Sequence, residues 1–377
     1  MRRLVAWAVA AGLPALALAG CGAEFPLPTE TEGGVYATDN SYQMVATWHW
    51  SSADTIADLL LTQGSGSQLF LLFNRAGTGT APRGGVYGYA LKAAPPSPPP
   101  IAGIDFRGLF VPAAMCASAS RVFVLDQGDS LLARDPATGR VGDLSLTWRV
   151  KEYGLLGGDT ITTFTDTSLA FVRGVAVDNQ ERVYVAGSAI VLIPDPQDAR
   201  IRTRTYQFRV NRYLRVAPGS ATDPYMPGTD RWIRDQNFIV EEGSGLGTLS
   251  DPRGLYWGNS VGGPGLFAAD FGKNWVQKLS DAVSSTGQYK IDADSSSSLN
   301  GPVDVATDLA GYVYLTDTGN RRVLRYDAYG QFVQRVDVEL DSQGQPLADP
   351  VALAADDTLV YVGDRAANKV IRYQRRK

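Results

Sequence analysis

The chain has 377 residues, of which 44% are hydrophobic and 20% are charged. A chain of this length and composition can bury one large core or two medium ones, so disorder is excluded as its main state. The formal net charge of -4 at pH 7 argues against nucleic acid as a partner of the whole surface, because phosphate binding needs a basic surface.

The first 21 residues have the order of an export signal. A positive start, Met1-Arg2-Arg3, precedes an apolar run over residues 4–18, which Pro and Gly interrupt and which is too short for a comfortable membrane span. Leu18-Ala19-Gly20 and then Cys21 follow. This segment resembles the lipobox of bacterial lipoproteins, which implies that residues 1–20 are removed and that Cys21 is lipidated. The alternative is an ordinary signal peptide cleaved after residues 17–19.

Gly22 stands where an inner-membrane retention signal typically has Asp. The resemblance therefore implies a cell-envelope location, anchored through lipid to the outer membrane if the cell has one. Residues 21–34 are polar and contain Pro, which predicts a tether, and the folded domain is expected over 35–377. With Cys21 acylated, Cys116 would have no intramolecular partner, and we expect it to be a small core residue.

Short apolar runs around polar turns repeat along the rest of the chain. The runs at 265–269, 312–316 and 359–363 end at Asp270, Asp317 and Asp364, which are 47 residues apart. Equal spacing over three units indicates a repeat. A turn containing Asn274, Asn320 or Asn368 and a second apolar run follow each Asp, which predicts a β-hairpin.

Further strands complete each unit. A strand opened by Pro or Gly begins near residues 251, 301 and 349, and one more run after the hairpin gives four antiparallel strands. Fainter units cover 58–91, 110–140, which contains Asp126, and 171–193, where Gly187 lies near the position of the Asp. One such sheet cannot cover both of its faces. The sequence therefore predicts an all-β fold, a six-bladed β-propeller of four-stranded antiparallel blades, whose ring is closed by residues 35–48.

The strand and turn motifs of residues 171–186, 301–327 and 349–374 resemble the NHL repeat of six-bladed β-propellers. The resemblance is convincing over 251–374 and plausible over 107–193. Asp126, Asp270, Asp317 and Asp364 are expected to accept hydrogen bonds from turn N–H groups, while the Asn residues tolerate the left-handed turn position. We therefore interpret these residues as structural.

Signals for catalysis are weak in this sequence. His49 is the only histidine, so no catalytic residue, no metal ligand set and no cofactor are assigned. Residues 292–298 and 193–200 could bind Ca²⁺ weakly, but they lack the ordered loop of dedicated sites. Propeller hydrolases such as the lactonase and strictosidine-synthase-like groups place carboxylates and Asn around a channel metal, for which Asp304, Asp178 and Asn179 are the candidates. A metal-dependent hydrolase or lyase is thus the alternative function.

Two features favour binding instead. Arg173 and Arg253 begin first strands, where the resemblance implies a position at the channel mouth, so they either receive an anionic group or pair with a neighbouring Asp. The second feature is an expected insertion at about 194–250, where arginines alternate with apolar and aromatic residues. Its candidate binding residues are Arg200, Arg202, Arg204, Arg209, Tyr206 and Trp232.

This cationic strand either engages an acidic polymer or protein or is an ordinary solvated outer strand. From the sequence we therefore expect a monomeric, non-catalytic recognition or scaffold module of the cell envelope, held to the membrane through its lipid anchor. Its expected partner is an envelope protein or an anionic ligand, and nucleic acid is not expected.

Overall fold

The computed structural model describes residues 41–49, 54–62, 68–75, 83–91, 104–128, 148–198, 200, 202–216, 231–238, 240–279 and 288–376. Residues 1–40, which contain Cys21, the expected signal, the tether and the start of the expected closing strand, lie outside this set. The described part is all-β apart from a single 3₁₀ turn, Thr318–Asn320. No helix within it is long and apolar enough to cross a bilayer.

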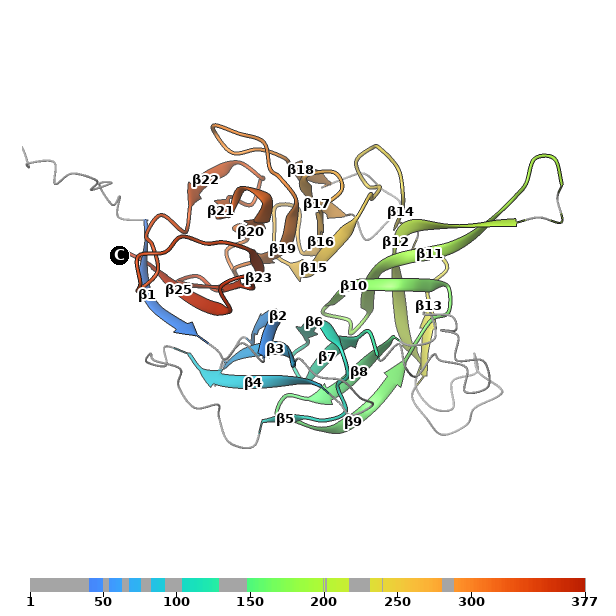
Figure 1. Cartoon of the computed structure of the whole chain (residues 1–377), viewed down its shortest axis with the longest axis horizontal. Coiled ribbons are helices and arrows are strands. Elements are labelled where there is room, and N and C mark those ends of the chain that lie inside the picture. The colour runs from blue at the N-terminus through green and yellow to red at the C-terminus, as the bar shows by residue number, and fades with distance from the viewer. Residues whose placement is uncertain are drawn as a thin grey trace, which may run out of the picture. The chain divides into compact units, whose positions relative to one another are not determined.

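The described strands form six sheets, and the first strand of each is followed by antiparallel neighbours. The first strands are β2 (Asp54–Leu61), β6 (Pro112–Ala117), β10 (Leu169–Val177), β15 (Pro252–Gly258), β19 (Pro302–Thr307) and β23 (Pro350–Ala355). Each contacts the first strands of the sheets before and after it, and β23 contacts β2. The sheets are thus arranged around a common centre in a propeller-like fold (Figure 1).

Two of the sheets have the expected four antiparallel strands in sequence order. The fourth sheet adds β16 (Gly265–Asp270), β17 (Trp275–Leu279) and β18 (Tyr289–Ile291) to β15. The fifth adds β20 (Val313–Asp317), β21 (Arg322–Tyr326) and β22 (Phe332–Arg335) to β19. Val, Leu, Tyr and Phe recur in these strands, and such residues pack well on a pleated surface.

The first and second sheets depart from four antiparallel strands. The first has three described strands, β2, β3 (Gln68–Arg75) and β4 (Gly84–Ala90). The second has five: β6, β7 (Arg121–Asp126), β8 (Arg149–Gly154), β9 (Gly157–Phe164) and the short β5 (Asp105–Phe106), which pairs with β9 in parallel. In the second sheet only β5 departs from the expected pattern, because β6, β7, β8 and β9 pair in antiparallel order.

The last sheet contains strands from both ends of the described chain. β23 pairs with β24 (Leu359–Asp364), β24 with β25 (Lys369–Arg375), and β25 with β1 (Tyr42–His49) in antiparallel register. This partner for the edge of β25 was expected from the sequence. Within β1, Trp48 is 4% exposed and stacks on Tyr361, with ring centroids 6.1 Å apart.

The hydrophobic core lies between the sheets. Among the described residues it forms six clusters, and each contains residues of two neighbouring sheets, including the last and the first. Trp48, Leu59 and Tyr361 belong to the cluster that joins the last sheet to the first. Burying a large apolar side chain contributes about 1.5–3 kcal/mol, so each sheet is stabilised chiefly by its neighbours.

The region 194–250, expected from the sequence to be an insertion, contributes strands to the third sheet. These are β12 (Arg202–Val216), β13 (Arg231–Arg234) and β14 (Val240–Glu241), which lie beside β10 and β11 (Val183–Pro194). The second half of β12, from Arg209, is the third strand of the sheet, and its first half extends farther. That half pairs with the end of β11 as a two-stranded arm, residues 188–208, which projects from the sheet (Figure 1).

The arm occupies the position of a hairpin turn in the other sheets. Gly187 pairs with Arg209, as Asp270 pairs with Trp275 and Asp364 with Lys369. In those sheets the chain turns at once, whereas after Gly187 the two strands continue outward. The sequence does contain this signal, because Gly187 replaces the Asp that organises the short turn.

Candidate functional site

A buried aspartate ends the second strand of four sheets. These residues are at most 1% exposed: Asp126, Asp270, Asp317 and Asp364. The carboxylate of Asp270 accepts the backbone N–H groups of Ser250 and Asp251 at 2.9 and 2.8 Å, and that of the turn residue Lys273 at 3.3 Å. The aspartate therefore holds both the turn, as expected, and the segment that leads into the first strand of its own sheet.

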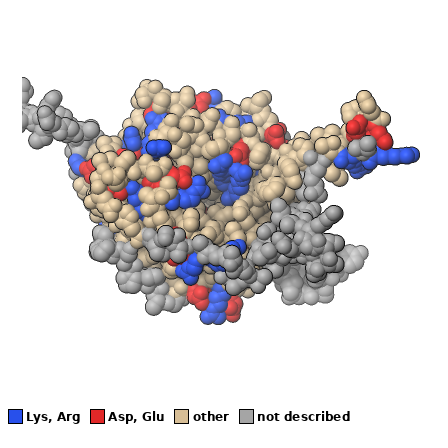
Figure 2. All heavy atoms as spheres, viewed as in Figure 1, with Lys and Arg blue, Asp and Glu red and all other residues tan. Residues whose placement is uncertain are grey.

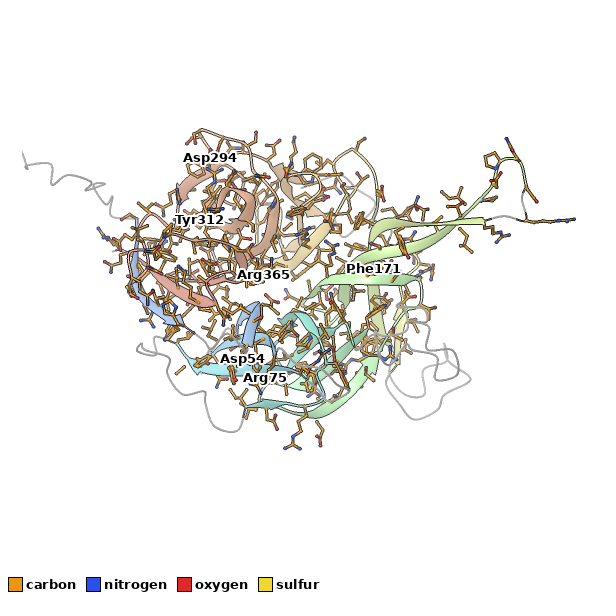
Figure 3. All side chains as sticks on the ribbon, in the orientation of Figure 1. Asp54, Arg75, Phe171, Asp294, Tyr312 and Arg365 are labelled. Atoms are coloured by element: carbon orange, nitrogen blue, oxygen red, sulfur yellow. The ribbon has the colours of Figure 1, made fainter. Side chains whose placement is uncertain are left out.

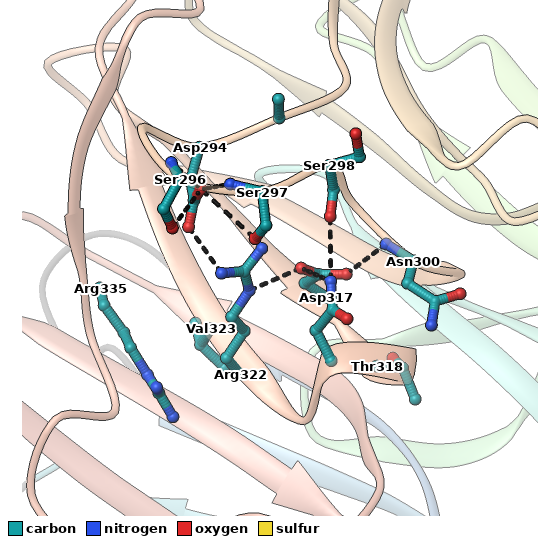
Figure 4. A network of polar contacts seen from close by, with 12 residues as sticks. Asp294, Ser296, Ser297, Ser298, Asn300, Asp317, Thr318, Arg322, Val323 and Arg335 are labelled. Carbon is teal, nitrogen blue, oxygen red and sulfur yellow. Dashed lines mark hydrogen bonds and ion pairs between the residues drawn. The ribbon is translucent and has the colours of Figure 1, made fainter.

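Figure 4 shows the network around Asp317. Asp317 accepts the N–H of Asn300 at 2.7 Å, the side-chain amide of Asn320 at 2.8 Å and Nε of Arg322 at 2.7 Å. Arg322 also donates to Asp294 at 2.6 Å. A buried carboxylate needs this number of donors, because burying an unpaired charge is costly.

The left-handed turn position is occupied by Asn274 and Asn368, whose φ angles are 55° and 46°. In the fifth sheet the expectation for Asn320 is wrong, since Arg321 has the positive φ of 55° there. The reason is local: Asn320 ends the 3₁₀ turn, and its side chain donates to Asp317.

The same aspartates fix two carboxylates at the centre of one face. Asp270 binds the backbone of Asp251, whose carboxylate accepts Nη1 of Arg173 at 2.8 Å and Nη2 of Arg253 at 3.1 Å. In the last sheet, Asp364 accepts the N–H of Asp349 at 3.0 Å, and the Asp349 carboxylate accepts Nε of Arg365 at 2.9 Å. The ion pairs thus rest on backbone that buried hydrogen bonds hold in place.

Arg173, Arg253 and Arg365 line a cavity of about 330 Å³. Figure 3 places Arg365 toward the centre of the ring, and Figure 2 shows basic side chains beside acidic ones in the middle of this face. Burial lowers the pKa of Arg253, and the charges of Arg173 and Arg365 lower it further. Three guanidinium groups pair with two carboxylates here, those of Asp251 and Asp349.

Two carboxylates from different sheets also line this cavity, Asp58 of β2 and Asp304 of β19. Each accepts the N–H of the next residue and one N–H from the first strand of the following sheet. That second donor is Met115 for Asp58 and Leu353 for Asp304, both at 2.7 Å. The two aspartates therefore connect neighbouring first strands around the centre.

Burial raises the pKa of both aspartates. The pKa of Asp304 rises to about 7, and the charge of Asp304 raises that of Asp58 further. Both residues also line a second, larger cavity of about 560 Å³, whose other lining residues include Cys116, Glu181 and Trp257. The arginine-lined cavity and the larger one therefore share this carboxyl pair in their walls.

The cavity brings together Arg173, Arg253 and Asp304, three residues singled out from the sequence. Sequence reasoning missed Asp58 and Arg365. Asp58 could have been found by comparing the first strands, because it stands between Ala57 and Leu59 as Asp304 stands between Val303 and Val305. Arg365 directly follows the repeat residue Asp364, but nothing in the sequence alone directs it to the centre.

Asp178 and Asn179, the other candidates for a channel metal, line the larger cavity. Asp178 is 2% exposed and is held by Arg182 and by the hydroxyl of Tyr184, which donates at 2.9 Å. Its carboxylate is therefore committed to structural contacts.

The cationic strand divides into two parts. In the half within the sheet, Arg209 pairs with Glu241 at 3.0 Å, and Arg215 pairs with Glu152 at 2.5 Å and lies over the ring of Trp232 at 5.0 Å. Arg209 therefore connects strands of the third sheet, whereas Arg215 and Trp232 contact the second sheet, at Glu152 and Phe164. The exposed side chains of Arg200, Arg202 and Tyr206 belong to the arm, as does Arg204.

Among the described residues, no group of three or more His, Cys, Asp or Glu side chains could hold a metal ion. In the segment 292–298, Asp294 accepts the N–H groups of Ser296 and Ser297 at 2.6 Å and pairs with Arg322. In the segment 193–200, Asp195 accepts the N–H of Gln197 at 2.7 Å. Both segments are turns closed by their own carboxylates.

The remaining reactive side chains lie apart. His49 is exposed at the end of β1. Cys116 is a free, half-buried thiol that packs against the core between the second and third sheets and also lines the larger cavity, and burial raises its pKa. A raised pKa keeps a thiol protonated and weakly nucleophilic.

No family model matches the chain, and no curated protein matches it. Among solved structures, it is similar to a catalytically inactive virginiamycin B lyase from Staphylococcus aureus with quinupristin. That alignment has a TM-score of 0.44 and 10% sequence identity and covers 89% of this chain and 99% of that chain. The assignment of the fold therefore rests on the strand pairing described above.

Proposed function

We propose that the protein is an exported, lipid-anchored six-bladed β-propeller with NHL-like repeats, a non-catalytic recognition module that binds an anionic ligand at the arginine-lined cavity. The six sheets are its blades, and β1 closes the ring by completing the last one. Supporting this are the contacts between successive first strands and the pairing of β1 with β25. A rigid scaffold of this kind spends little binding energy on ordering itself.

One observation carries the proposed ligand chemistry: Arg173, Arg253 and Arg365 line one cavity while sharing only Asp251 and Asp349. Guanidinium groups donate in a planar fork that matches carboxylate and phosphate oxygens. Burial and the positive charges of Arg173 and Arg365 disfavour the charged form of Arg253. An anion bound among the three guanidinium groups would offset this repulsion.

The ionisation of Asp58 and Asp304 sets the affinity of this cavity for an anion. Ionised Asp58 and Asp304 oppose the entry of an anion, and their protonated forms do not. Since the pKa of Asp304 lies at about 7, the affinity for an anion increases as the pH falls through neutrality.

The test uses titration calorimetry with inorganic phosphate and citrate at pH 6 and pH 8. Arg173→Gln combined with Arg365→Gln is expected to weaken binding by about tenfold or more, since each charged hydrogen bond contributes about 1.5–3 kcal/mol. Arg107→Gln is the matched control, because Arg107 is exposed and pairs with Asp105 outside the cavity. Unchanged binding in the double variant, or equal losses in the control, would refute the proposal.

A metal-dependent hydrolase or lyase is the second candidate function. The observation that favours it is the Asp58 and Asp304 pair in the wall of the larger cavity, because carboxylate oxygens are the ligands that Ca²⁺ prefers. Metal analysis of the purified protein decides between the two. Stoichiometric Ca²⁺ that is lost in Asp304→Asn would support the enzyme and argue against the recognition module.

The proposed lipid anchor at Cys21 is tested separately from the anion site. If Cys21 is acylated, mass spectrometry of the mature N-terminal peptide will find a lipid-modified Cys21, and Cys21→Ser will leave the protein in the soluble fraction. An unmodified peptide that starts before or after Cys21 would instead support the ordinary signal peptide.

A further inference from the structure

The arm exposes apolar side chains that the rest of the described fold does not cover. Tyr206 and Leu192 are 43% and 50% exposed, and Phe171 of β10, which pairs with Ser188 at the base of the arm, is 41% exposed. The rings of Phe171 and Tyr206 meet edge to face with centroids 5.2 Å apart. Tyr206 pairs across the strands with Ile190, and Leu192 lies two residues farther along β11, so Leu192 and Tyr206 share one face. The arm therefore presents an apolar stripe along that face.

The arm also presents an open strand edge. Among the described strands, none pairs with β12 on the side away from β11 before Arg209, where β14 begins. The N–H of Phe208 points to that side, because it donates to the carboxylate of Glu242 at 3.1 Å. Backbone direction alternates along a strand, so the N–H and C=O groups of Arg202, Arg204 and Tyr206 point the same way.

The charge of this edge is basic. Residues 202–208 of β12 contain Arg202 and Arg204 and no acidic residue, and the facing residues 188–194 carry no charge. Arg200 and Arg202 are exposed, in contrast to Arg209 and Arg215, which form ion pairs with Glu241 and Glu152. Free edges of natural sheets attract other strands, and opposite charge selects among them.

We infer that the arm is a docking site for an acidic extended segment of a partner protein, which adds as a strand along the β12 edge. The added backbone pairs with residues 202–206, its carboxylates meet Arg200 and Arg202, and its apolar side chains cover Tyr206 and Leu192. An isolated two-stranded hairpin is only marginally stable in water, so an added strand also stabilises the arm.

A protein partner fits this edge better than an anionic membrane does. The hydrocarbon region of a bilayer supplies no donors or acceptors for the open backbone groups of the arm, whereas an added strand pairs with each of them in register. The turn between the strands also contains Asp195 and Asp198, which an anionic lipid surface repels.

The experiment measures fluorescence anisotropy with two labelled probes, ten-residue peptides of alternating Glu and Val or alternating Lys and Val. Only the acidic peptide is expected to bind, and more weakly at high salt. Arg200→Glu with Arg202→Glu is expected to weaken its binding by about tenfold or more. Arg107→Glu with Lys290→Glu reverses the same number of exposed charges away from the arm and is expected to bind as the wild type does.

Two further variants separate backbone pairing from charge. Arg204→Pro and Arg204→Gln lose the same charge, but only proline removes the outward N–H, so Arg204→Pro is expected to bind about tenfold more weakly than Arg204→Gln. Replacing residues 190–206 by Asn-Gly joins the paired residues Ala189 and Gln207 through a two-residue turn. This armless protein is expected to melt as the wild type does and not to bind the peptide.

Three results would overturn the inference. Equal binding of both peptides would show that charge does not select the partner. Peptide binding that persists in the armless protein would place the site elsewhere. Sedimentation with phosphatidylglycerol vesicles, or dimerisation in ultracentrifugation, that requires the arm while the acidic peptide does not bind would assign the edge to a membrane or to a second copy. None of these results bears on the arginine-lined cavity, which the phosphate titration tests separately.

Discussion

Asp304→Asn should change how the stability of the protein depends on pH. In the folded protein the pKa of Asp304 is raised to about 7 from its ordinary value of 3.8, mainly because the carboxyl is buried. Between these two values the folded state holds a proton that the unfolded state has lost. This proton stabilises the fold fully below about pH 4, and the stabilisation is lost as the pH rises to about 7.

The magnitude follows from the width of that interval. Each pH unit contributes about 1.4 kcal/mol per proton, so the wild type loses at most about 4 kcal/mol relative to the variant between pH 4 and 7. Water in the adjoining cavities screens the charge and reduces this value. Asn keeps one oxygen acceptor but cannot accept both the Val305 and Leu353 N–H groups, which adds a cost of about 1–3 kcal/mol that does not depend on pH.

Urea unfolding followed by tryptophan fluorescence, at intervals from pH 4.5 to 8, measures the difference in unfolding free energy between wild type and variant. The difference should shift steadily in favour of the variant up to about pH 7 and then become constant. Asp58→Asn should behave in the same direction. A difference that stays constant across the whole range would show that Asp304 ionises as it does in the unfolded chain, and the proposed pH control of anion affinity would then be wrong.

Three other changes test the fold. Asp317→Ala leaves the Asn300 N–H and Arg322 without their buried acceptor and should cost about 3–5 kcal/mol in urea unfolding; a loss below about 1 kcal/mol would contradict the described network. Gly254→Ala should lower the melting temperature, because its Cβ would lie 2.6 Å from the Val303 carbonyl oxygen, whereas Gly245→Ala, with nothing within 4 Å, serves as the neutral control. Equal melting of the two would disprove close approach at the centre. Removal of residues 35–48 should collapse thermal stability through loss of the β1 pairing, and an unchanged melt would refute ring closure.

Much of the fold could be predicted because each repeat is recognisable from residues that are close together in the sequence. Hairpin turns at Asp270, Asp317 and Asp364 depend on short-range hydrogen bonds, so their spacing is visible in the sequence. The third sheet was harder to predict. Gly187 lacks the carboxylate that organises a short turn, and the continuous strand beyond it looked like an insertion although it extends the same sheet.

The candidate site was only partly predictable. Arg173 and Arg253 belong to the repeat pattern and were found, and Asp251 lies two residues before Arg253, but Arg365 joins them only through the arrangement of the sheets. The electrostatic interaction of Asp58 with Asp304 likewise depends on an arrangement that brings together residues nearly 250 positions apart in the chain. Contacts between residues so far apart produce no repeating pattern in a single sequence, so they could not be predicted from it.

The antiparallel pairing of Tyr42–His49 with Lys369–Arg375 has a consequence for biosynthesis. The ribosome must complete almost the whole polypeptide before the first strand meets its partner, so the final sheet cannot mature during translation. Until then the apolar face of β1, which includes Trp48, has no partner strand to cover it. The slow step of maturation should therefore be this late annealing of the two ends.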